Sequence, residues 1–308
     1  MIPRINRFFQ GLSYLLWGLW VVFEVNVLRR KRPFLGGLVV NDRCNLGCEH
    51  CRVSNRNVPD LSLDEIREGL RQFKAMGIRL LAITGGEPYL WCDGDLRLDD
   101  VIETARGMGF KAISLYTNGT LPLESAADTL FVSLDGTRET TNKLRGNVYD
   151  TVMANIERST HPNLFINYTI NRSNRDELEA FCDQMSRISQ VRGVFFYFHT
   201  PYYGVDDLLL SLEEKRPLID ELLRLKTRYN VLNSSACLKA VRADAWKRPT
   251  DVCYVYAEKK MFQCCRAIGN EEACRNCGYL GYPEIISLLE ARPSAIREAL
   301  QYMPRRVR

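Results

Sequence analysis

The sequence predicts an α/β fold in which parallel strands form a partial (β/α)6 barrel, with an apolar N-terminal helix before it and a small cysteine-rich segment after it. Three observations carry this prediction. Short apolar runs alternate with helix-like stretches between residues 38 and 229, which is typical of parallel β/α units. Polar loops that contain glycine directly follow several of those runs. The remaining chain is apolar near its beginning and rich in cysteine near its end.

Six segments are predicted to be strands because they are short, apolar and bounded by turn residues. They are 38–41, 80–84, 112–117, 129–134, 164–170 and 193–199. Helices are expected between and after them, at 62–76, 98–108, 148–158, 174–190 and 211–229. Three of these helices begin at a cap, namely Ser62, Asn174 or Ser211, each followed three residues later by Glu. Crossover connections would curl the units into a partial barrel whose post-strand loops share the end where barrels carry their chemistry.

The bulk properties suit one large domain with smaller additions, which we expect as 1–33, 34–230 and 231–308. Of the 308 residues, 46% are hydrophobic, which is enough for an ordinary buried core. The net charge of +5 is mild and no RNA-binding module is visible after residue 229, so no nucleic-acid partner is expected. The 11 cysteines gather at 44–51 and 253–277 with close spacings, which favours metal ligation over disulfides.

The segment from Phe8 to Leu28 is almost entirely apolar and is flanked by basic residues. As a helix, its 21 residues would reach about 31 Å, close to the thickness of a bilayer core. Three interpretations remain open: a helix that spans the membrane, a helix that lies in the membrane interface, and a helix docked on the barrel. Glu24 and Asn26 are costly in hydrocarbon, which supports the interfacial helix. We expect membrane association, with the catalytic domain on the cytoplasmic face because its thiols need a reducing compartment.

The loop from Cys44 to Cys51 carries three cysteines, Cys44, Cys48 and Cys51, in a C-x3-C-x2-C pattern. Thiolates are the usual protein ligands of iron–sulfur clusters. A cubane cluster has four irons, so three thiolates leave one iron free to bind a small molecule. In the same way, catalytic zinc sites differ from structural ones by an open coordination position. A structural zinc site is the alternative, but such a site has four protein ligands and this loop provides three.

This spacing resembles the signature of the radical S-adenosylmethionine (SAM) superfamily. Three further segments resemble that family's SAM-binding motifs and occur in the same order, namely Gly85-Gly86-Glu87-Pro88, Thr117-Asn118-Gly119 and Ser133-Leu134-Asp135-Gly136. The resemblance implies that Cys44, Cys48 and Cys51 hold a 4Fe–4S cluster whose open iron chelates SAM. After reduction by a partner such as flavodoxin or ferredoxin, the cluster would cleave SAM to a 5′-deoxyadenosyl radical.

The same resemblance implies a set of SAM contacts. Glycines let the backbone approach a ligand and a carboxylate pairs with an ammonium, so the family's GGEP motif recognises the SAM amino group. The residues that would bind SAM are Gly85, Gly86, Glu87, Pro88, Asn118, Ser133, Asp135 and Asn167. The position before the third cysteine, commonly aromatic in the family, is His50 here.

The second cysteine group forms the pattern C-x10-C-C-x8-C-x2-C and begins as a short hairpin with a cysteine at each end. It resembles the start of the SPASM or twitch domains of radical SAM enzymes, which hold auxiliary 4Fe–4S clusters. One cluster could be closed by Cys253, Cys264, Cys274 and Cys277, with Cys265 as a substitute for Cys264. A four-thiolate zinc site, or no metal, remains an alternative.

The sequence therefore predicts a radical SAM enzyme held at a membrane surface and acting on a lipid-like or isoprenoid substrate. A weaker resemblance to hopanoid-biosynthesis radical SAM enzymes, through Cys277-Gly278-Tyr279 and the basic, partly apolar N-terminal segment, points the same way. Two alternatives stay open. One is a peptide maturase of the twitch or SPASM type. The other is a non-catalytic iron–sulfur electron carrier, which would not need Gly85 to Pro88.

Overall fold

The structure is a computed structural model that describes residues 17–202 and 204–303. Its main sheet has eight strands in the order β10-β9-β1-β2-β5-β6-β7-β8. The central strands are β1 (Leu35–Val39), β2 (Leu80–Thr84), β5 (Ala112–Thr117), β6 (Thr129–Ser133), β7 (Leu164–Ile170) and β8 (Val191–Phe198). These six run parallel and pair in chain order, and β1 also pairs in parallel with β9. The predicted partial (β/α)6 barrel is confirmed.

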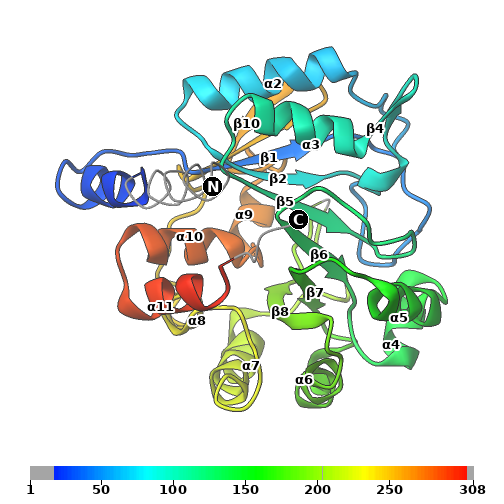
Figure 1. Cartoon of the computed structure of the whole chain (residues 1–308). Coiled ribbons are helices and arrows are strands. Elements are labelled where there is room, and N and C mark those ends of the chain that lie inside the picture. The colour runs from blue at the N-terminus through cyan, green and yellow to red at the C-terminus, as the bar shows by residue number, and fades with distance from the viewer. Residues whose placement is uncertain (1–16, 203, 304–308) are drawn as a thin grey trace, which may run out of the picture.

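The crossover helices cover the outer side of the curved sheet (Figure 1). They are α2 (Leu63–Ala75), α3 (Leu98–Gly107), α4 (Arg138–Arg145), α5 (Tyr149–Arg158), α6 (Leu178–Ser186) and α7 (Leu212–Leu225). Short elements lie in the loops, namely η1 (Pro88–Leu90), the hairpin β3 (Cys92–Asp93) and β4 (Leu96–Arg97), and η2 (Arg175–Glu177). Since every crossover returns the chain to the same end of the sheet, the loops after β1, β2, β5, β6 and β7 meet at its carboxyl end.

Two of the three predicted helix caps are present. Ser62 and Ser211 each form a capping box, with Glu65 and Glu214, at the start of α2 and α7. The prediction that Asn174 caps a helix reaching residue 190 is wrong. Asn174 makes no side-chain cap, a 3-10 turn follows it, and α6 ends at Ser186. Its amide instead donates hydrogen bonds to the backbone oxygens of Asp135 and Thr169, so tertiary contacts override the local signal.

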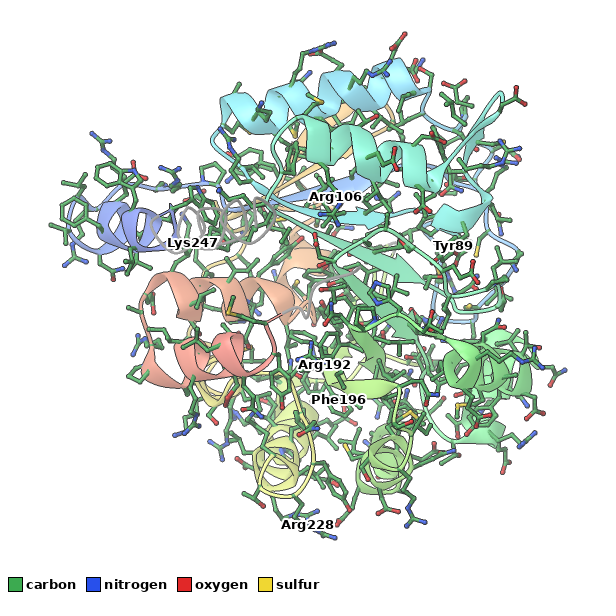
Figure 2. All side chains as sticks on the ribbon, in the orientation of Figure 1. Tyr89, Arg106, Arg192, Phe196, Arg228 and Lys247 are labelled. Atoms are coloured by element: carbon green, nitrogen blue, oxygen red, sulfur yellow. The ribbon has the colours of Figure 1, made fainter. Side chains whose placement is uncertain are left out.

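The core fills the space between the sheet and its outer helices. Figure 2 shows Phe196 inside this layer and Arg228 at the outer surface. The opposite, inner face of β5 to β8 carries aromatic rings, which stack from Tyr116 through Phe131 to Phe165. Outer positions such as Leu130 and Val132 alternate with them and are fully buried. The barrel interior is therefore walled by aromatic side chains next to the carboxyl-end loops.

The N-terminal helix is described over residues 17–26, and the predicted residues 8–16 lie outside the described part of the chain. One face docks on the body, where Val21 is buried and Asn26 donates a hydrogen bond to the backbone oxygen of Leu289. Glu24 is buried in an ion pair with Arg32, so neither polar residue faces solvent unpaired. The other face exposes large apolar side chains, namely Leu19, Trp20 and Phe23, followed by Val27 and Leu28. Within 17–202 and 204–303, no helix has the length and apolar character needed to cross a bilayer.

The C-terminal segment packs against both ends of the sheet region rather than forming a separate body. It contains α8 (Ser235–Arg242), β9 (Cys253–Ala257), β10 (Lys260–Gln263), α9 (Glu271–Arg275), α10 (Gly281–Leu289) and α11 (Pro293–Gln301). The predicted hairpin with cysteines at its ends is confirmed as β9 and β10. Because β9 pairs with β1, the hairpin lies directly beside the strand that leads into the first cysteine loop. Figure 1 shows α10 next to the N-terminal helix, and Val21 of that helix packs with Leu289 of α10.

Candidate cofactor site and C-terminal cysteine cavity

The three N-terminal cysteines lie together in the loop after β1, and all three are partly buried. The loop is held by its own backbone, since Cys51 N–H donates to the Cys48 oxygen at 3.1 Å. Asn55 bridges the loop from outside: it accepts from Cys44 N–H at 2.8 Å and donates to the Leu46 oxygen at 3.1 Å. Leu46 N–H also points at the Cys44 sulfur, 3.4 Å away. The fold therefore presents three thiols from one short loop at the carboxyl end of the barrel.

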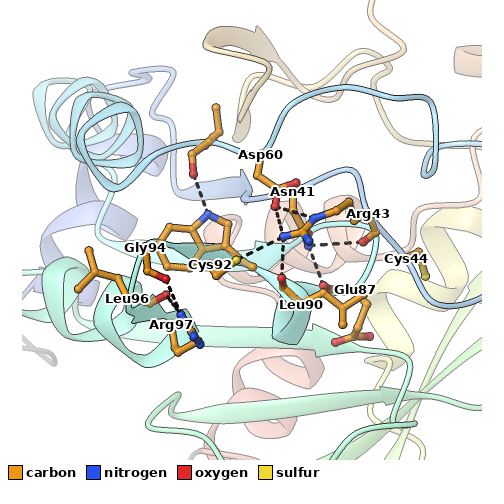
Figure 3. A network of polar contacts seen from close by, with 12 residues as sticks. Asn41, Arg43, Cys44, Asp60, Glu87, Leu90, Cys92, Gly94, Leu96 and Arg97 are labelled. Atoms are coloured by element: carbon orange, nitrogen blue, oxygen red, sulfur yellow. Dashed lines mark hydrogen bonds and ion pairs between the residues drawn. The ribbon is translucent and has the colours of Figure 1, made fainter.

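Arg43 ties this loop to the loop after β2 (Figure 3). Its guanidinium pairs with Asp60 at 2.5 Å and donates to the Leu90 oxygen at 2.9 Å. Its backbone oxygen accepts from Glu87 N–H at 2.8 Å. Cys92 lies 3.7 Å from the same guanidinium. Arg43, which directly precedes the first cysteine, thus fixes the position of the cysteine loop. The cysteine motif alone does not predict this role.

Gly85 and Gly86 lie against the cysteine loop so closely that a side chain has no room. A Cβ on Gly85 would stand 1.9 Å from Asn41 Oδ1, and one on Gly86 would stand 2.2 Å from the Arg43 oxygen. Gly86 N–H donates to the Asn41 oxygen at 3.0 Å. The glycines of this motif are therefore required by backbone packing between the loops after β1 and β2.

Glu87 is fully buried and its carboxylate is bonded to the protein. It accepts from Thr117 Oγ1 at 2.9 Å, Asn118 N–H at 2.7 Å and Tyr89 N–H at 3.2 Å. Burial raises the pKa of Glu87, and these hydrogen bonds oppose that shift. The sequence motif predicts a carboxylate that pairs with the SAM ammonium, whereas here both carboxylate oxygens accept hydrogen bonds that join the loops after β2 and β5.

Asn118 brings the loop after β5 to the first cysteine. Its Nδ2 donates to Asn45 Oδ1 at 2.8 Å and lies 3.8 Å from the Cys44 sulfur. Its Oδ1 accepts from the backbone N–H and the hydroxyl of Thr120, which fixes the orientation of the amide. Burial raises the pKa of Cys44, while the Asn118 amide and Leu46 N–H favour its thiolate. Thiolate is the form that binds a metal.

Asp135 and Arg145 form a fully buried ion pair beside the second cysteine. The Asp135 carboxylate accepts from Arg145 Nη2 at 2.6 Å and from Thr169 N–H at 2.7 Å. His50 Nε2 lies 3.5 Å from the same carboxylate, and burial lowers the pKa of His50 to about 4. Burial also raises the pKa of Cys48 to about 11, although the Arg145 charge opposes it. Asp135 is thus engaged with protein groups from α4 and from β7.

Two further predicted contacts, Ser133 and Asn167, are direct partners in the pairing of β6 with β7. The Asn167 amide oxygen is buried and has no hydrogen-bond donor in the described part of the chain, and the same holds for His50 Nδ1. Unsatisfied buried polar atoms are costly unless a ligand completes them. Three thiols, a glycine cradle and orphaned polar atoms form a donor set that fits an iron–sulfur cluster with a small polar ligand.

The C-terminal cysteines line a cavity that encloses about 360 Å³ of empty space, part of it open to solvent. Four cysteines face it, namely Cys264, Cys265, Cys274 and Cys277. Cys253 is not among the lining residues; it is buried behind them, where its oxygen accepts from Cys264 N–H at 2.8 Å. Among the described residues, no three His, Cys, Asp or Glu side chains are close enough together to hold a single metal ion.

The cavity thiols differ in acidity. A hydrogen bond with the Cys264 thiol lowers the pKa of Cys265 to about 7 and raises that of Cys264. Burial raises the pKa of Cys277 to about 11 and that of Cys253 to about 12. Cys265 is therefore the thiol that most readily becomes a thiolate, which sequence spacing alone could not show.

A row of tyrosines joins the barrel interior to this cavity. The Tyr116 and Tyr197 hydroxyls are 3.4 Å apart, and the Tyr197 and Tyr279 rings lie 4.8 Å apart. Tyr279 packs on Tyr282, with 4.5 Å between their centroids, and the Tyr282 hydroxyl donates to the Cys264 oxygen at 2.7 Å. The aromatic interior of the barrel thus continues to the cysteine cavity.

Comparison with known proteins identifies the domain that contains the first site. Residues 38–185 match the model of the radical SAM superfamily. Among curated relatives, Fe-coproporphyrin III synthase of Methanosarcina barkeri is 30% identical over 200 residues, covering 59% of this chain and 48% of that protein. A probable GTP 3′,8-cyclase of Methanothermobacter marburgensis is 27% identical over 195 residues, covering 57% and 63%. The chain thus spans about half to two thirds of these relatives' length.

Solved structures with the same fold cover more of the chain. Streptococcus suis SuiB bound to S-adenosylmethionine aligns over 86% of this chain and 67% of its own, with a TM-score of 0.61 and 14% identity. The protein anSMEcpe, with bound AdoMet and a Kp18Cys peptide, aligns over 89% and 82%, with a TM-score of 0.52 and 15% identity. The matched family model includes all three cysteines of the first loop and the glycine cradle. Residues 38–185 of this chain therefore carry a radical SAM domain.

Proposed function

We propose that this enzyme reductively cleaves SAM at a 4Fe–4S cluster held by Cys44, Cys48 and Cys51. The single observation that carries the proposal is the convergence of these thiols with the loops after β2, β5 and β6. The cluster, when bound, supplies the electron that converts SAM to methionine and a 5′-deoxyadenosyl radical.

The residues around the thiols have separable tasks in this proposal. Gly85 and Gly86 let the backbone come close to SAM. Asn118 orients the loop beside Cys44, while the Asn167 oxygen, which has no donor among the described residues, is available to a ligand. Glu87 and Asp135 hold the loops in place, since their carboxylates accept hydrogen bonds from the protein.

The test is SAM cleavage by the anaerobically reconstituted and reduced chain, followed as release of 5′-deoxyadenosine. In Cys48→Ala, the iron content should fall by that of one cluster, and SAM cleavage should be lost as well. Cys182→Ala is the matched control, because Cys182 is buried on α6 away from the site and its loss should leave both unchanged. Undiminished cleavage by the Cys48 variant would refute the assignment. A non-catalytic electron carrier would show no SAM binding in calorimetry of the loaded protein.

The cysteine cavity is proposed to hold an auxiliary 4Fe–4S cluster. Four thiols face one cavity next to the aromatic interior, and thiolates are the ligands that such clusters use. We assign Cys264, Cys265, Cys274 and Cys277 as its ligands, in place of the set with Cys253. Iron and sulfide counts on a Cys274→Ala/Cys277→Ala variant should fall by one cluster. An iron and sulfide count equal to that of the parent chain would refute these four cysteines as cluster ligands. Zinc found in the parent chain would show that the cavity holds a zinc site instead of a cluster.

We also propose that the enzyme works at the cytoplasmic face of a membrane on a lipid-like or isoprenoid substrate. The support is the exposed apolar face of the N-terminal helix, where the Trp20 and Phe23 rings stack at 5.6 Å. Arg29, Arg30 and Lys31 follow it and are exposed, which suits anionic headgroups. By their names, the curated relatives concern coproporphyrin and GTP, so this substrate class rests on the helix.

Co-sedimentation with vesicles tests the membrane proposal. The full chain should bind vesicles that contain anionic lipid, and Trp20→Ser/Phe23→Ser should lose most of this binding. Val205→Ser is the matched control, since Val205 is an exposed apolar residue far along the chain in the loop after β8. Equal binding by the double variant would refute the role of this face. Turnover of a precursor peptide without vesicles would favour the peptide-maturase alternative.

A further inference from the structure

Lys215 is a buried lysine without a carboxylate partner among the described residues. It lies on α7 and is 6% exposed. Its ammonium is directed to the Asn276 oxygen at 3.4 Å and stands 5.5 Å from the centre of the Phe198 ring. No described Asp or Glu comes within ion-pair distance of it. A neutral carbonyl and an aromatic face are weak compensation for a charge removed from water.

Lys226, a largely buried lysine at the C-terminal end of the same helix, shows how such a charge is usually compensated. The Lys226 ammonium pairs with Glu298 at 3.3 Å and donates to the Val231 oxygen at 2.7 Å. Burying an ammonium is costly unless an opposite charge and hydrogen bonds compensate it. The environment of Lys215 lacks the opposite charge that Glu298 gives to Lys226.

Lys215 lies next to the segment that carries one of the cavity thiols, although it is not itself among the residues that line the cavity. Asn276, its hydrogen-bond acceptor, directly precedes Cys277, one of the cavity thiols. Another cation does line the cavity: Arg248 stacks on Trp246 at 4.7 Å and pairs with Asp244. Arg248 therefore lines the cavity with its charge paired, whereas the Lys215 ammonium lies beside the Cys277 segment without a described counter-charge.

We propose that Lys215 is the buried counter-ion of an anionic metal–thiolate centre in this cavity. The inference rests on the proposed auxiliary site, and it adds that the centre bound there carries a net negative charge. Metal binding releases the thiol protons, and four thiolates outweigh the charge of a zinc ion or of an oxidised 4Fe–4S core. The net negative charge of the loaded centre then supplies what Lys215 lacks.

A cation beside an iron–sulfur cluster stabilises the reduced form, which carries one more negative charge. Replacing Lys215 by Met should therefore move the midpoint potential of this centre to a more negative value. We expect the equilibrium constant for its one-electron reduction to fall about tenfold, which corresponds to about 59 mV. Lys215→Arg keeps the charge and should keep the potential.

The experiment uses the full-length chain with Cys44, Cys48 and Cys51 changed to Ala, so that the cavity holds the only cluster. Iron, sulfide and zinc are counted after anaerobic reconstitution, and the potential is measured by a redox titration followed by electron paramagnetic resonance. Lys226→Met, which removes a largely buried lysine at the end of the same helix and away from the cavity, is the matched control and should leave the potential unchanged. If Lys215→Met does not fold, Lys215→Gln keeps a polar tip near Asn276 and gives the same comparison.

The outcomes separate the two proposals. Metal in the parent, with a negative shift in Lys215→Met alone, supports the counter-ion role. Metal in the parent with no shift overturns it and leaves the auxiliary site intact. If the parent binds zinc instead of iron, weaker zinc retention against a chelator in Lys215→Met, but not in Lys215→Arg, supports the role. A parent that binds neither metal overturns the auxiliary site and the counter-ion together.

Discussion

The Glu87 carboxylate lies 2.7 Å from the backbone nitrogen of Asn118, which donates a hydrogen bond to it. This contact joins the loop after β2 to the loop after β5, and both residues are buried. Asn118 in turn reaches Cys44 with its side chain. A glutamate that its motif predicts to contact the ligand therefore organises the protein around the cysteine loop.

Glu87→Gln should destabilise the protein and weaken SAM binding through the same contact. The amide can no longer accept from both Thr117 and Asn118, and losing a hydrogen bond to a buried charge costs about 1.5–3 kcal/mol. Urea unfolding of the metal-free chain measures the first effect, and calorimetry of the loaded chain measures the second. Glu103→Gln, on the exposed side of α3, is the control and should change neither. Wild-type stability in the Glu87 variant would show that the contact is dispensable.

Gly86→Ala should separate the two loops that carry the site. The new Cβ would stand 2.2 Å from the Arg43 oxygen and 2.5 Å from the Asp42 oxygen, which are backbone atoms that cannot swing away. We expect a cost of about 1–3 kcal/mol in unfolding free energy and a lower iron content. In Gly107→Ala the new methyl meets nothing within 4 Å, so stability should stay equal or rise by up to about 1 kcal/mol. Full iron loading in Gly86→Ala would contradict the packing argument.

Much of the barrel could be predicted because its strands are short, apolar and sharply bounded. The segments 80–84, 112–117 and 164–170 match β2, β5 and β7 residue for residue. The first strand begins at Leu35, three residues before its predicted start, because Gly36 and Gly37 weaken the local strand signal. Its pairing with both β2 and β9 stabilises what local sequence does not indicate.

The remaining features depend on contacts that are distant in sequence. Lys215 stands between charged residues on α7 and resembles part of a solvated face. It is buried against the Phe198 ring and against the cysteine segment some sixty residues later. Arg145 likewise follows a polar run, yet its partner Asp135 lies on the preceding loop. Motif spacing identified the cysteine loop and the glycines, whereas the charges that surround them came from tertiary packing.

Arg145→Met should be strongly destabilising because it leaves the Asp135 carboxylate buried without its counter-charge. Breaking a buried ion pair from one side costs about 3–5 kcal/mol. The matched control is Arg138→Met, seven residues earlier, whose pair with Asp150 is exposed and should be worth less than about 1 kcal/mol. Guanidinium unfolding of both variants measures the difference. Similar midpoints for the two would contradict the assignment of Asp135 as a charged, buried group.

Glu214 should make stability depend on pH in an acidic window. Its carboxylate pairs with Arg172 and Arg175 and accepts from Ser211 N–H, which fixes the start of α7 to the loop after β7. The hydrogen bond from Arg172 is the largest cause that lowers the pKa of Glu214, to about 2. The folded state lowers the pKa of Glu214 below its ordinary value. The charged carboxylate therefore stabilises the fold, and this stabilisation is complete above about pH 5.

The stabilisation by Glu214 is lost as the pH falls from its unfolded pKa toward about 2, where the folded form is protonated too. Urea unfolding of wild type and Glu214→Gln should therefore differ at pH 7 and converge as the pH is lowered below about 4. Glu213→Gln is the neighbouring control, since the Glu213 side chain has no ion pair in the described part of the chain, and it should follow wild type throughout. A difference between wild type and Glu214→Gln that stayed constant from pH 7 to pH 3 would mean that side-chain shape, and not charge, fixes the start of α7.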